Sequence, residues 1–270
     1  MHSGPKKQGP SPRDVFITVY GRKPVLEALD NPALTVAKVH VADNAHGDTV
    51  DAILRAAGDA DLEVERTSAQ RVKLLAGNGR HDQGVVADVV APRMQPLEDF
   101  LRRTRRHARG DTHPGRKPQT TAVLVLDAIT NPSNVGMILR TATAAGLDGV
   151  VLPHSGTPEV GPLVIKASAG VAFRAPILRC TTAAQAAHLL RQAGFVVYGL
   201  AGTGDAPLYD AELAPMAAFV LGNETRGVTP EVRRQVEQWL SIPLFGGVES
   251  LNVASAAAVV AYELVRRRPR

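Results

Sequence analysis

The chain has 270 residues, of which 44% are hydrophobic and 21% are charged, a composition ordinary for a folded globular protein with one large domain or two smaller ones. Its single cysteine, Cys180, excludes an internal disulfide and a multi-thiolate metal site. No apolar run approaches the ~20 residues of a membrane-spanning helix, and the first 14 residues lack the apolar core of a signal peptide, so we expect a cytoplasmic protein without a membrane partner.

The net charge of +5, from 31 basic and 26 acidic residues, is unevenly distributed. Basic residues exceed acidic ones by four in residues 1–24, by six in 100–119 and by four in 266–270, so the rest of the chain is acidic. An acidic body with basic arms is typical of a protein that binds a polyanion such as a nucleic acid. Arms that only keep the protein soluble would have the same pattern, and charge alone leaves both interpretations open.

Residues 1–14, rich in Gly, Pro and Lys, predict a disordered basic tail. Strand-like and helix-like segments then alternate over residues 15–90, which predicts a small α/β domain. We expect strands at 15–20, 36–42, 62–66 and 84–90, and helices at 22–29, 48–58 and 68–77.

Residues 91–119 predict a basic flexible linker between two domains. The segment around 97–106 favours a short basic helix, and the sequence GDTHPGRKPQ at 110–119 has the glycine and proline content of a flexible connection.

Residues 120–270 predict a second and larger α/β domain. We expect strands at 121–127, 149–153, 195–200, 217–222 and 239–243, and helices at 135–146, 162–170, 181–194, 230–238 and 250–265. Two of these helices end at glycine, Gly146 and Gly194, as C-capping favours. Strands separated by helices indicate a mostly parallel sheet covered on both faces, and such sheets bind ligands beyond the carboxyl ends of their strands.

The first of three notable loops follows the strand that ends at Asp127. It leads into a helix expected to start near Val135, with Asn134 at the entrance and Arg140 about two turns further on. Asn134 could be only an N-cap and Arg140 only a surface residue. Because the neighbours of Arg140 are apolar or small, we favour a role for Arg140 in binding an anion.

The second loop is VLGNETRGV at 220–228, where Gly222 and Gly227 bracket a turn that allows a ligand close to the backbone. Glu224 within it could equally be a solvated acid. The third loop opens the sequence SLNVASAAAVVAYELV at 250–265, which has the small apolar residues of a buried helix behind two polar ones, Ser250 and Asn252. Both are good N-caps, so capping by itself would explain them.

Competing chemistries have little support. The sequence AGTG at 201–204 is too short for a dinucleotide fingerprint, and no G-x-x-x-x-G-K-[ST] motif is present. The eight histidines show no metal-ligand spacing, and Ser250 has no obvious His–Asp pair for a hydrolase triad.

Three motifs carry a resemblance to a known family. The sequences NPSNVGMILRTA, LGNETRGV and IPLFGGVESLNVASAAAVVAYE resemble the motifs of the SpoU/TrmH family of RNA 2′-O-ribose methyltransferases in the SPOUT superfamily, and IKASAG at 165–170 is similar to a further family segment. The match covers roughly 120–266. The sequences VYGRKPVLEAL and HDQGVVADV resemble the substrate-binding domain of the family's 23S rRNA guanosine methyltransferase branch. Ala254 and the additional Asp82 depart from the family pattern.

The resemblance implies an α/β fold with a C-terminal SPOUT domain tied in a deep trefoil knot, which composition would not suggest. It implies a homodimer whose core includes the last helix, and S-adenosyl-L-methionine as the cofactor, held largely by backbone groups in the knot. The implied cofactor-binding residues are Ala201, Gly202, Thr203, Leu221, Gly222, Asn223, Gly227, Ile242, Leu244, Ser250, Leu251 and Asn252.

The resemblance also implies the catalytic residues Arg140, Asn134, Glu224, Ser250 and Asn252. A guanidinium stays protonated, so we favour Arg140 as a phosphate clamp and alkoxide stabiliser over a general base, with the proton acceptor unassigned and no metal required. We expect RNA contacts from Arg22, Lys23, Arg102, Arg103, Arg105, Arg106 and Lys166. The leading hypothesis is 2′-O-methylation of structured RNA, most of all 23S rRNA. A tRNA substrate, an antibiotic-resistance site in rRNA, and an inactive RNA-binding assembly factor are the alternatives.

Overall fold

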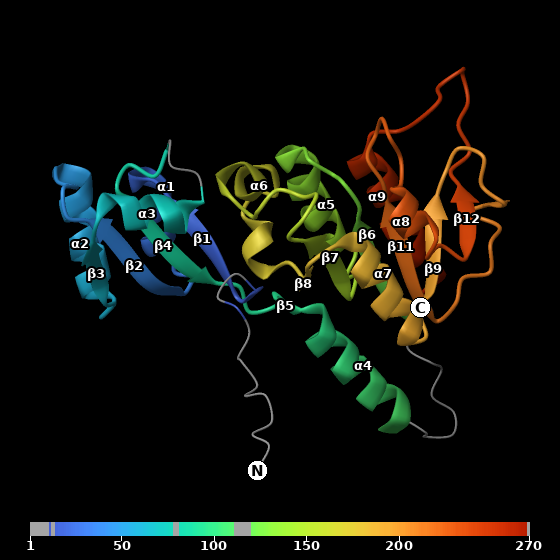
Figure 1. Ribbon diagram of the computed structural model, residues 1–270, viewed down its shortest axis with the longest axis horizontal. Helices are drawn as coiled ribbons and strands as arrows, with labels where there is room; N and C mark the ends of the chain where they lie inside the picture. The colour runs from blue at the N-terminus through green and yellow to red at the C-terminus, as the bar shows by residue number, and fades with distance from the viewer. Residues whose placement is uncertain (1–10, 12–13, 78–80, 111–119, 269–270) are drawn as a thin grey trace, which may run out of the picture.

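The structure is a computed structural model that describes residues 11, 14–77, 81–110 and 120–268, without the side chains of 106–110. Two sheets lie side by side along the long axis of the molecule (Figure 1). The predicted tail at 1–14, except Ser11 and Asp14, and the end of the predicted linker at 111–119 lie outside the described residues.

The N-terminal domain is a four-stranded sheet in the order β1-β4-β2-β3 with three helices. Its elements are β1 Phe16–Tyr20, α1 Arg22–Leu29, β2 Val36–Ala42, α2 Asp48–Asp59, β3 Val64–Thr67, α3 Ala69–Ala76 and β4 Val85–Val90. Strand β4 runs antiparallel to β1 and β2, whereas β3 is parallel to β2. All seven elements lie within one or two residues of the predicted segments.

The C-terminal domain is an eight-stranded sheet in the order β10-β12-β9-β11-β6-β7-β8-β5, and every pairing in it is parallel. The strands are β5 Gln95–Pro96, β6 Thr121–Leu126, β7 Gly149–Pro153, β8 Ile177–Cys180, β9 Val196–Leu200, β10 Ala206–Pro207, β11 Met216–Leu221 and β12 Gln238–Ser241. The predicted parallel α/β domain is confirmed.

Helices cover both faces of this sheet, as its apolar strands require. They are α4 Leu97–Gly110, α5 Pro132–Ala144, α6 Pro162–Ala167, α7 Ala183–Gln192, α8 Pro230–Arg233 and α9 Val253–Arg267, with a 3₁₀ turn at Val171–Arg174. Alternate residues of β6 divide between the two cores. Leu124 and Leu126 pack in the core that includes α5 and α9, whereas Val123 and Val125 pack in the core that includes α4 and α7.

Several local features differ from the predictions, including the helix predicted at 162–170, which ends at Ala167. Helix α5 starts at Pro132 rather than near Val135, because Asn131 caps it by accepting a hydrogen bond from Ser133 N at 2.9 Å. The helix predicted at 230–238 ends at Arg233, since the chain then turns into β12. Strands β8 and β10 were not predicted, because they are only four and two residues long. The last helix starts at Val253 rather than Ser250.

The predicted linker also differs over its first part. Gln95–Pro96 pair with Leu178–Arg179 at the edge of the C-terminal sheet, and α4 follows at once. Leu97, Phe100 and Leu101 of α4 are buried in the core on that face. Apolar residues at helical spacing therefore fix 95–101 to the C-terminal domain, so this part is not a flexible linker.

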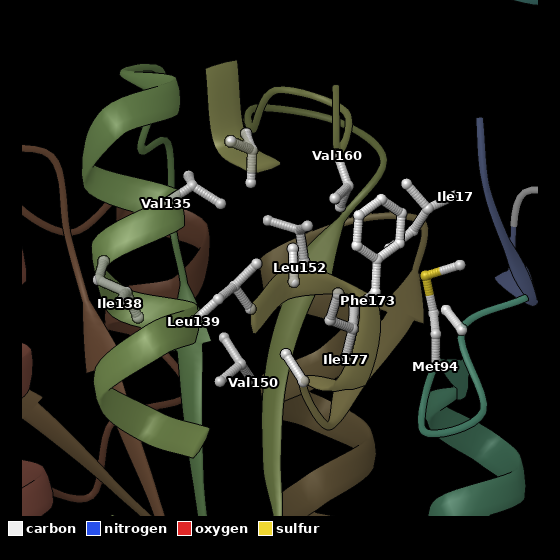
Figure 2. Packing of buried hydrophobic residues seen from close by; sticks show 14 of the residues in the cluster. Ile17, Met94, Val135, Ile138, Leu139, Val150, Leu152, Val160, Phe173 and Ile177 are labelled. Carbon is white, nitrogen blue, oxygen red and sulfur yellow. The ribbon is translucent and has the colours of Figure 1, made fainter. Parts of the chain in front are cut away.

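One continuous core crosses the junction between the two domains. Ile17 of β1 and Met94 lie beside Val160 and Phe173 of the C-terminal domain, and all four are buried (Figure 2). Polar contacts reinforce the junction, because His154 Nε2 lies 3.0 Å from Asp14 Oδ1. Among the described residues, no helix is long and apolar enough to cross a membrane.

Candidate functional site

Three segments from distant parts of the sequence meet beyond the carboxyl ends of the central strands. They are the start of α5 after β6, the loop that follows β11, and the start of α9 after β12. Parallel strands place these loops at one edge of the sheet. Each of the three loops singled out in the sequence contributes one side chain to a shared hydrogen-bond chain.

Asn134 is the centre of that chain. It is only 4% exposed, in the first turn of α5, so it is not the N-cap that its place in the sequence would allow. Its Nδ2 donates to Glu224 Oε1, and its Oδ1 accepts from Nδ2 of Asn252 at 3.1 Å. A buried amide with both ends bonded has one defined orientation, because each of its donors and acceptors needs a partner.

Asn252 is the N-cap of α9. Its Oδ1 accepts from Ala254 N at 2.9 Å and from Ser255 N at 3.4 Å, which leaves Nδ2 free to donate to Asn134. Capping and a place in the network are therefore combined in one residue. Ser250, the other capping candidate, is exposed and lies outside the helix.

The loop that holds Glu224 is closed by its own backbone. Asn223 and Gly227 exchange N–H···O bonds of 3.0 and 2.8 Å, and a Cβ on Gly222 would lie 2.5 Å from the carbonyl carbon of Gly227. Asp127 holds the end of the loop by accepting from Thr229 N at 2.6 Å, and burial raises the pKa of its carboxyl. These contacts require glycine at 222.

A cavity of about 130 Å³ lies between the loop after β9 and the loop before α9. It is lined by Leu200, Ala201, Gly202, Ile242, Leu244, Glu249, Ser250, Leu251 and Ala256. Six of these were predicted to bind the cofactor, namely Ala201, Gly202, Ile242, Leu244, Ser250 and Leu251. Leu200, Glu249 and Ala256 were not predicted, although Leu200 and Glu249 are each adjacent in sequence to a predicted residue.

The other predicted cofactor residues are not part of the cavity lining. Leu221 is buried at the end of β11, and Gly222, Asn223 and Gly227 belong to the closed loop after it. Thr203 is exposed next to Gly202. Asn252 directs both ends of its side chain toward backbone and Asn134, as described above.

Arg140 has a different environment from the Asn134 network. It is exposed on α5 and has no hydrogen bond or ion pair within the part of the chain that the structure describes. Met137, one turn earlier, is also exposed, at 40%. The guanidinium is thus available to an anion from outside the chain, and Asn134 and Glu224 do not orient it directly here.

The predicted RNA-binding residues lie at three places. On α4, Arg102 pairs with Asp99, Arg103 bonds Gln95, and Arg105 donates to Gln192 O at 3.0 Å, while the side chain of Arg106 is outside the described residues. In the N-terminal domain, Arg22 and Lys23 start α1. Lys166 is exposed at the end of α6.

The cavity and its loops suit S-adenosylmethionine. Leu200, Ile242 and Leu244 offer apolar walls for a flat purine, and Gly202 is close enough to the opposite loop that a Cβ there would lie 3.8 Å from Glu249 O. Apolar walls with a few polar groups at the rim are typical of cofactor sites. The lining residues therefore fit the chemistry of the cofactor that the motifs imply, and the cavity of about 130 Å³ holds only part of it, since typical small-molecule sites measure ~300–1,000 Å³.

Comparisons with known proteins agree with this description. Residues 121–262 match the SpoU rRNA methylase family, and residues 18–95 match the RNA 2′-O ribose methyltransferase substrate-binding family. A 23S rRNA (guanosine-2′-O-)-methyltransferase RlmB from Xanthomonas campestris is 33% identical over 250 residues, covering 93% of this chain and 96% of the relative. Among solved structures, the SpoU methyltransferase AviRb from Streptomyces viridochromogenes, in complex with AdoMet, is 25% identical with a TM-score of 0.57, covering 93% and 90%. An rRNA methyltransferase from Sinorhizobium meliloti is 25% identical with a TM-score of 0.59, covering 94% and 88%.

Proposed function

The chain belongs to the SpoU rRNA methylase family, and on that premise we propose that it transfers a methyl group from S-adenosylmethionine to a ribose 2′-hydroxyl of ribosomal RNA. The observation that carries the proposal is the Asn134–Glu224–Asn252 hydrogen-bond chain beside the cavity lined by Ile242 and Leu244. The relative named RlmB supports an rRNA substrate, and the AviRb complex supports the cofactor.

The cofactor is held by backbone and apolar groups in this proposal. Leu200, Ile242 and Leu244 would contact its base, and Gly202 leaves the cavity wall without a side chain at that point. When bound, S-adenosylmethionine supplies a methyl group on a sulfonium, an electrophile that needs no metal ion. Glu249 and Ser250, which also line the cavity, would bond its polar end.

Arg140 acts on the substrate side of the reaction. Its unpaired guanidinium clamps an RNA phosphate and stabilises the negative charge that develops on the 2′-oxygen. The Asn134 network does not contact Arg140. The role of the network is to hold the starts of α5 and α9 and the Glu224 loop in one arrangement. A network of this kind keeps reacting groups within the narrow geometry that an in-line transfer requires.

We further propose that the methylated nucleotide is a guanosine of 23S rRNA and that the reaction takes place in the cytoplasm. It is supported by the RlmB relative, which aligns over both domains, and by the match of 18–95 to a substrate-binding domain. A tRNA substrate or a resistance-conferring rRNA site would use the same chemistry.

We also propose a homodimer through α5 and α9. The two helices pack together, and their outer faces expose Met137 at 40% and Tyr262 at 53%. Exposed apolar side chains on adjacent helices are typical of an interface. Sedimentation analysis of the full chain tests this, since Tyr262→Glu should shift a wild-type dimer to monomer, and a monomeric wild type would contradict the proposal.

The decisive test of the function is a methylation assay with purified components. Purified full-length protein is incubated with S-adenosylmethionine and unmethylated 23S rRNA or total tRNA, and 2′-O-methylation is mapped at nucleotide resolution. We expect one methylated ribose in 23S rRNA. Methylation confined to tRNA would overturn the finer assignment, and no methylation with intact cofactor binding would favour a non-catalytic RNA-binding factor.

A further inference from the structure

A second cavity, of about 560 Å³, lies in the N-terminal domain, away from the cofactor cavity. Its volume is within the ~300–1,000 Å³ typical of small-molecule sites. The polar side chains that line it are Arg22, Asn44, Lys73, Asp82 and Gln83. They come from the start of α1, the loop after β2, helix α3 and the loop before β4, and we call this cavity the N-terminal hollow.

The N-terminal hollow is built from loops that hydrogen bonds hold in place. Gln83 Oε1 accepts from Arg22 N at 3.0 Å, and Gln83 O accepts from Arg22 Nε at 3.2 Å. A Cβ on Gly84 would lie 2.9 Å from Ala45 Cβ, so the loops after β2 and before β4 are in close contact. The lining is therefore preformed, which lowers the entropic cost of binding a ligand.

Asp82 is the unusual group in this hollow. It is only 6% exposed, and its Oδ1 accepts from Gly84 N at 2.8 Å. Within the described residues, its Oδ2 has no hydrogen-bond donor and its carboxylate has no cation partner. Among the described residues the fully buried side-chain atoms without a partner are His40 Nδ1 and Arg179 Nε, so Oδ2 of Asp82 keeps contact with solvent and is accessible to a ligand that offers N–H donors.

Two cationic side chains complement this acceptor. The Nη1 and Nη2 groups of Arg22 and the ammonium group of Lys73 have no hydrogen-bond or ion-pair partners among the residues described. Guanidinium and ammonium groups beside a carboxylate and two amides match a nucleotide, whose phosphate needs cations and whose base edge needs both donors and acceptors.

We propose that the N-terminal hollow binds one unpaired nucleotide of the substrate RNA, with Asp82 reading the base and Lys73 and Arg22 holding phosphate. Guanine fits best, because its N1–H and N2–H are two adjacent donors for a carboxylate. RNA-binding proteins recognise unpaired bases in this way, through hydrogen bonds to base edges that are engaged in pairing in a duplex. This inference rests on the proposed function, since the nucleotide belongs to the RNA that the enzyme methylates.

The test compares full-length variants for binding to a 23S rRNA transcript. Asp82→Asn keeps the acceptor for Gly84 N but replaces carboxylate with amide, and should weaken binding about 5–100-fold if one base contact is lost. Lys73→Ala should weaken it and reduce the salt slope by about one. The matched controls are Asp59→Asn and Arg55→Ala on the exposed side of α2, which should bind as wild type. Thermal melting of each variant excludes a folding defect.

A second measurement separates this inference from the proposed function. Transcript containing 6-thioguanosine is crosslinked to the wild-type protein, and the modified peptides are sequenced. A crosslink at Asn44–Ala45 or Asp82–Gly84 that is lost in Asp82→Asn supports the hollow, even if the enzyme methylates no RNA and the proposed function fails. Methylation by the wild type together with unchanged binding by Asp82→Asn and Lys73→Ala, and no such crosslink, would overturn the hollow alone.

Discussion

The side chains of Asn252 and Asn134 are joined by a 3.1 Å hydrogen bond although the residues lie 118 positions apart. Asn252 uses its other end to cap α9, and Asn134 uses its other end to bond Glu224. The start of α9, the first turn of α5 and the loop after β11 are therefore coupled. A substitution in any one of these segments should therefore alter the positions of the side chains in the other two.

Substitution of Asn252 separates the capping role from the network. Asn252→Ala removes both, and should lower the free energy of unfolding by about 1 kcal/mol as well as slow methyl transfer. Asn252→Asp keeps an acceptor for Ala254 N but cannot donate to Asn134 Oδ1, which is then left buried without a donor, so the helix cap is retained while methyl transfer slows. Denaturant unfolding and single-turnover methylation measure the two effects. Full activity in Asn252→Asp would show that the network is only a scaffold for the cap.

Removal of the Arg140 guanidinium should slow methyl transfer about 10²–10³-fold, by analogy with the loss of one donor that stabilises a developing oxyanion. Cofactor affinity should change little, because Arg140 does not line the cavity. Arg140→Lys should not restore the rate, since an ammonium cannot reproduce the planar fork. Single-turnover methylation and calorimetry on the same preparations check this. Near-wild-type turnover by Arg140→Ala would contradict its assigned role.

Replacing the four α4 residues Arg102, Arg103, Arg105 and Arg106 with Ala should weaken RNA binding and reduce its dependence on salt, because phosphate contacts release counterions. Cofactor binding should be unchanged. The comparison is binding of a 23S rRNA transcript at several salt concentrations. Because Arg105 also bonds Gln192 O, Arg105→Ala alone serves as a control for loss of that contact. An unaltered affinity and salt slope in the fourfold variant would leave these arginines a structural or solubilising role.

Glu263 should make stability depend on pH in acid. Its carboxylate is buried on α9, and hydrogen bonds from Arg266 and then Arg267 lower its pKa from 4.5 to about 2. Because the folded-state pKa is below the unfolded one, this stabilisation is complete above about pH 4.5 and is lost as the pH falls toward 2. Glu263→Gln should lower the free energy of unfolding at pH 7 by about 1–3 kcal/mol. Unfolding measured from pH 7 to 2 should show a shallower slope in the variant, and parallel curves would contradict this account.

A C-terminal fragment should bind S-adenosylmethionine without the N-terminal domain, but its boundary matters. A fragment of 92–270 keeps β5 and α4, whereas one of 120–270 exposes the surface against which Leu97, Phe100 and Leu101 pack. We expect the longer fragment to be folded and to bind the cofactor as the full chain does, and the shorter one to have a lower melting temperature. Calorimetry and thermal melting compare them. A folded longer fragment that does not bind the cofactor would contradict the placement of the site.

The sequence by itself determined the elements whose signals are local. Strands such as 36–42 and helices such as 22–29 were predicted at their observed bounds, because apolar periodicity and turn residues act over a few positions. The loops that carry Asn134, Glu224 and Asn252 were also found, since polar and glycine residues at the ends of apolar strands stand out in such a fold.

The tertiary structure decided which candidate in a loop has which partner. Ser250 and Asn252 have equal N-cap preference in the sequence. In the fold, Asn252 caps α9 and also donates to Asn134, because α5 packs beside the start of α9. The short strands β5 and β8 exist because a neighbouring strand supplies their hydrogen bonds, which no local propensity reveals. The grouping of Asp82 with Arg22 and Lys73 likewise arises where four segments of the N-terminal domain converge. Contacts between residues far apart in the chain depend on the whole packing of the domain, and for that reason no short stretch of sequence encodes them.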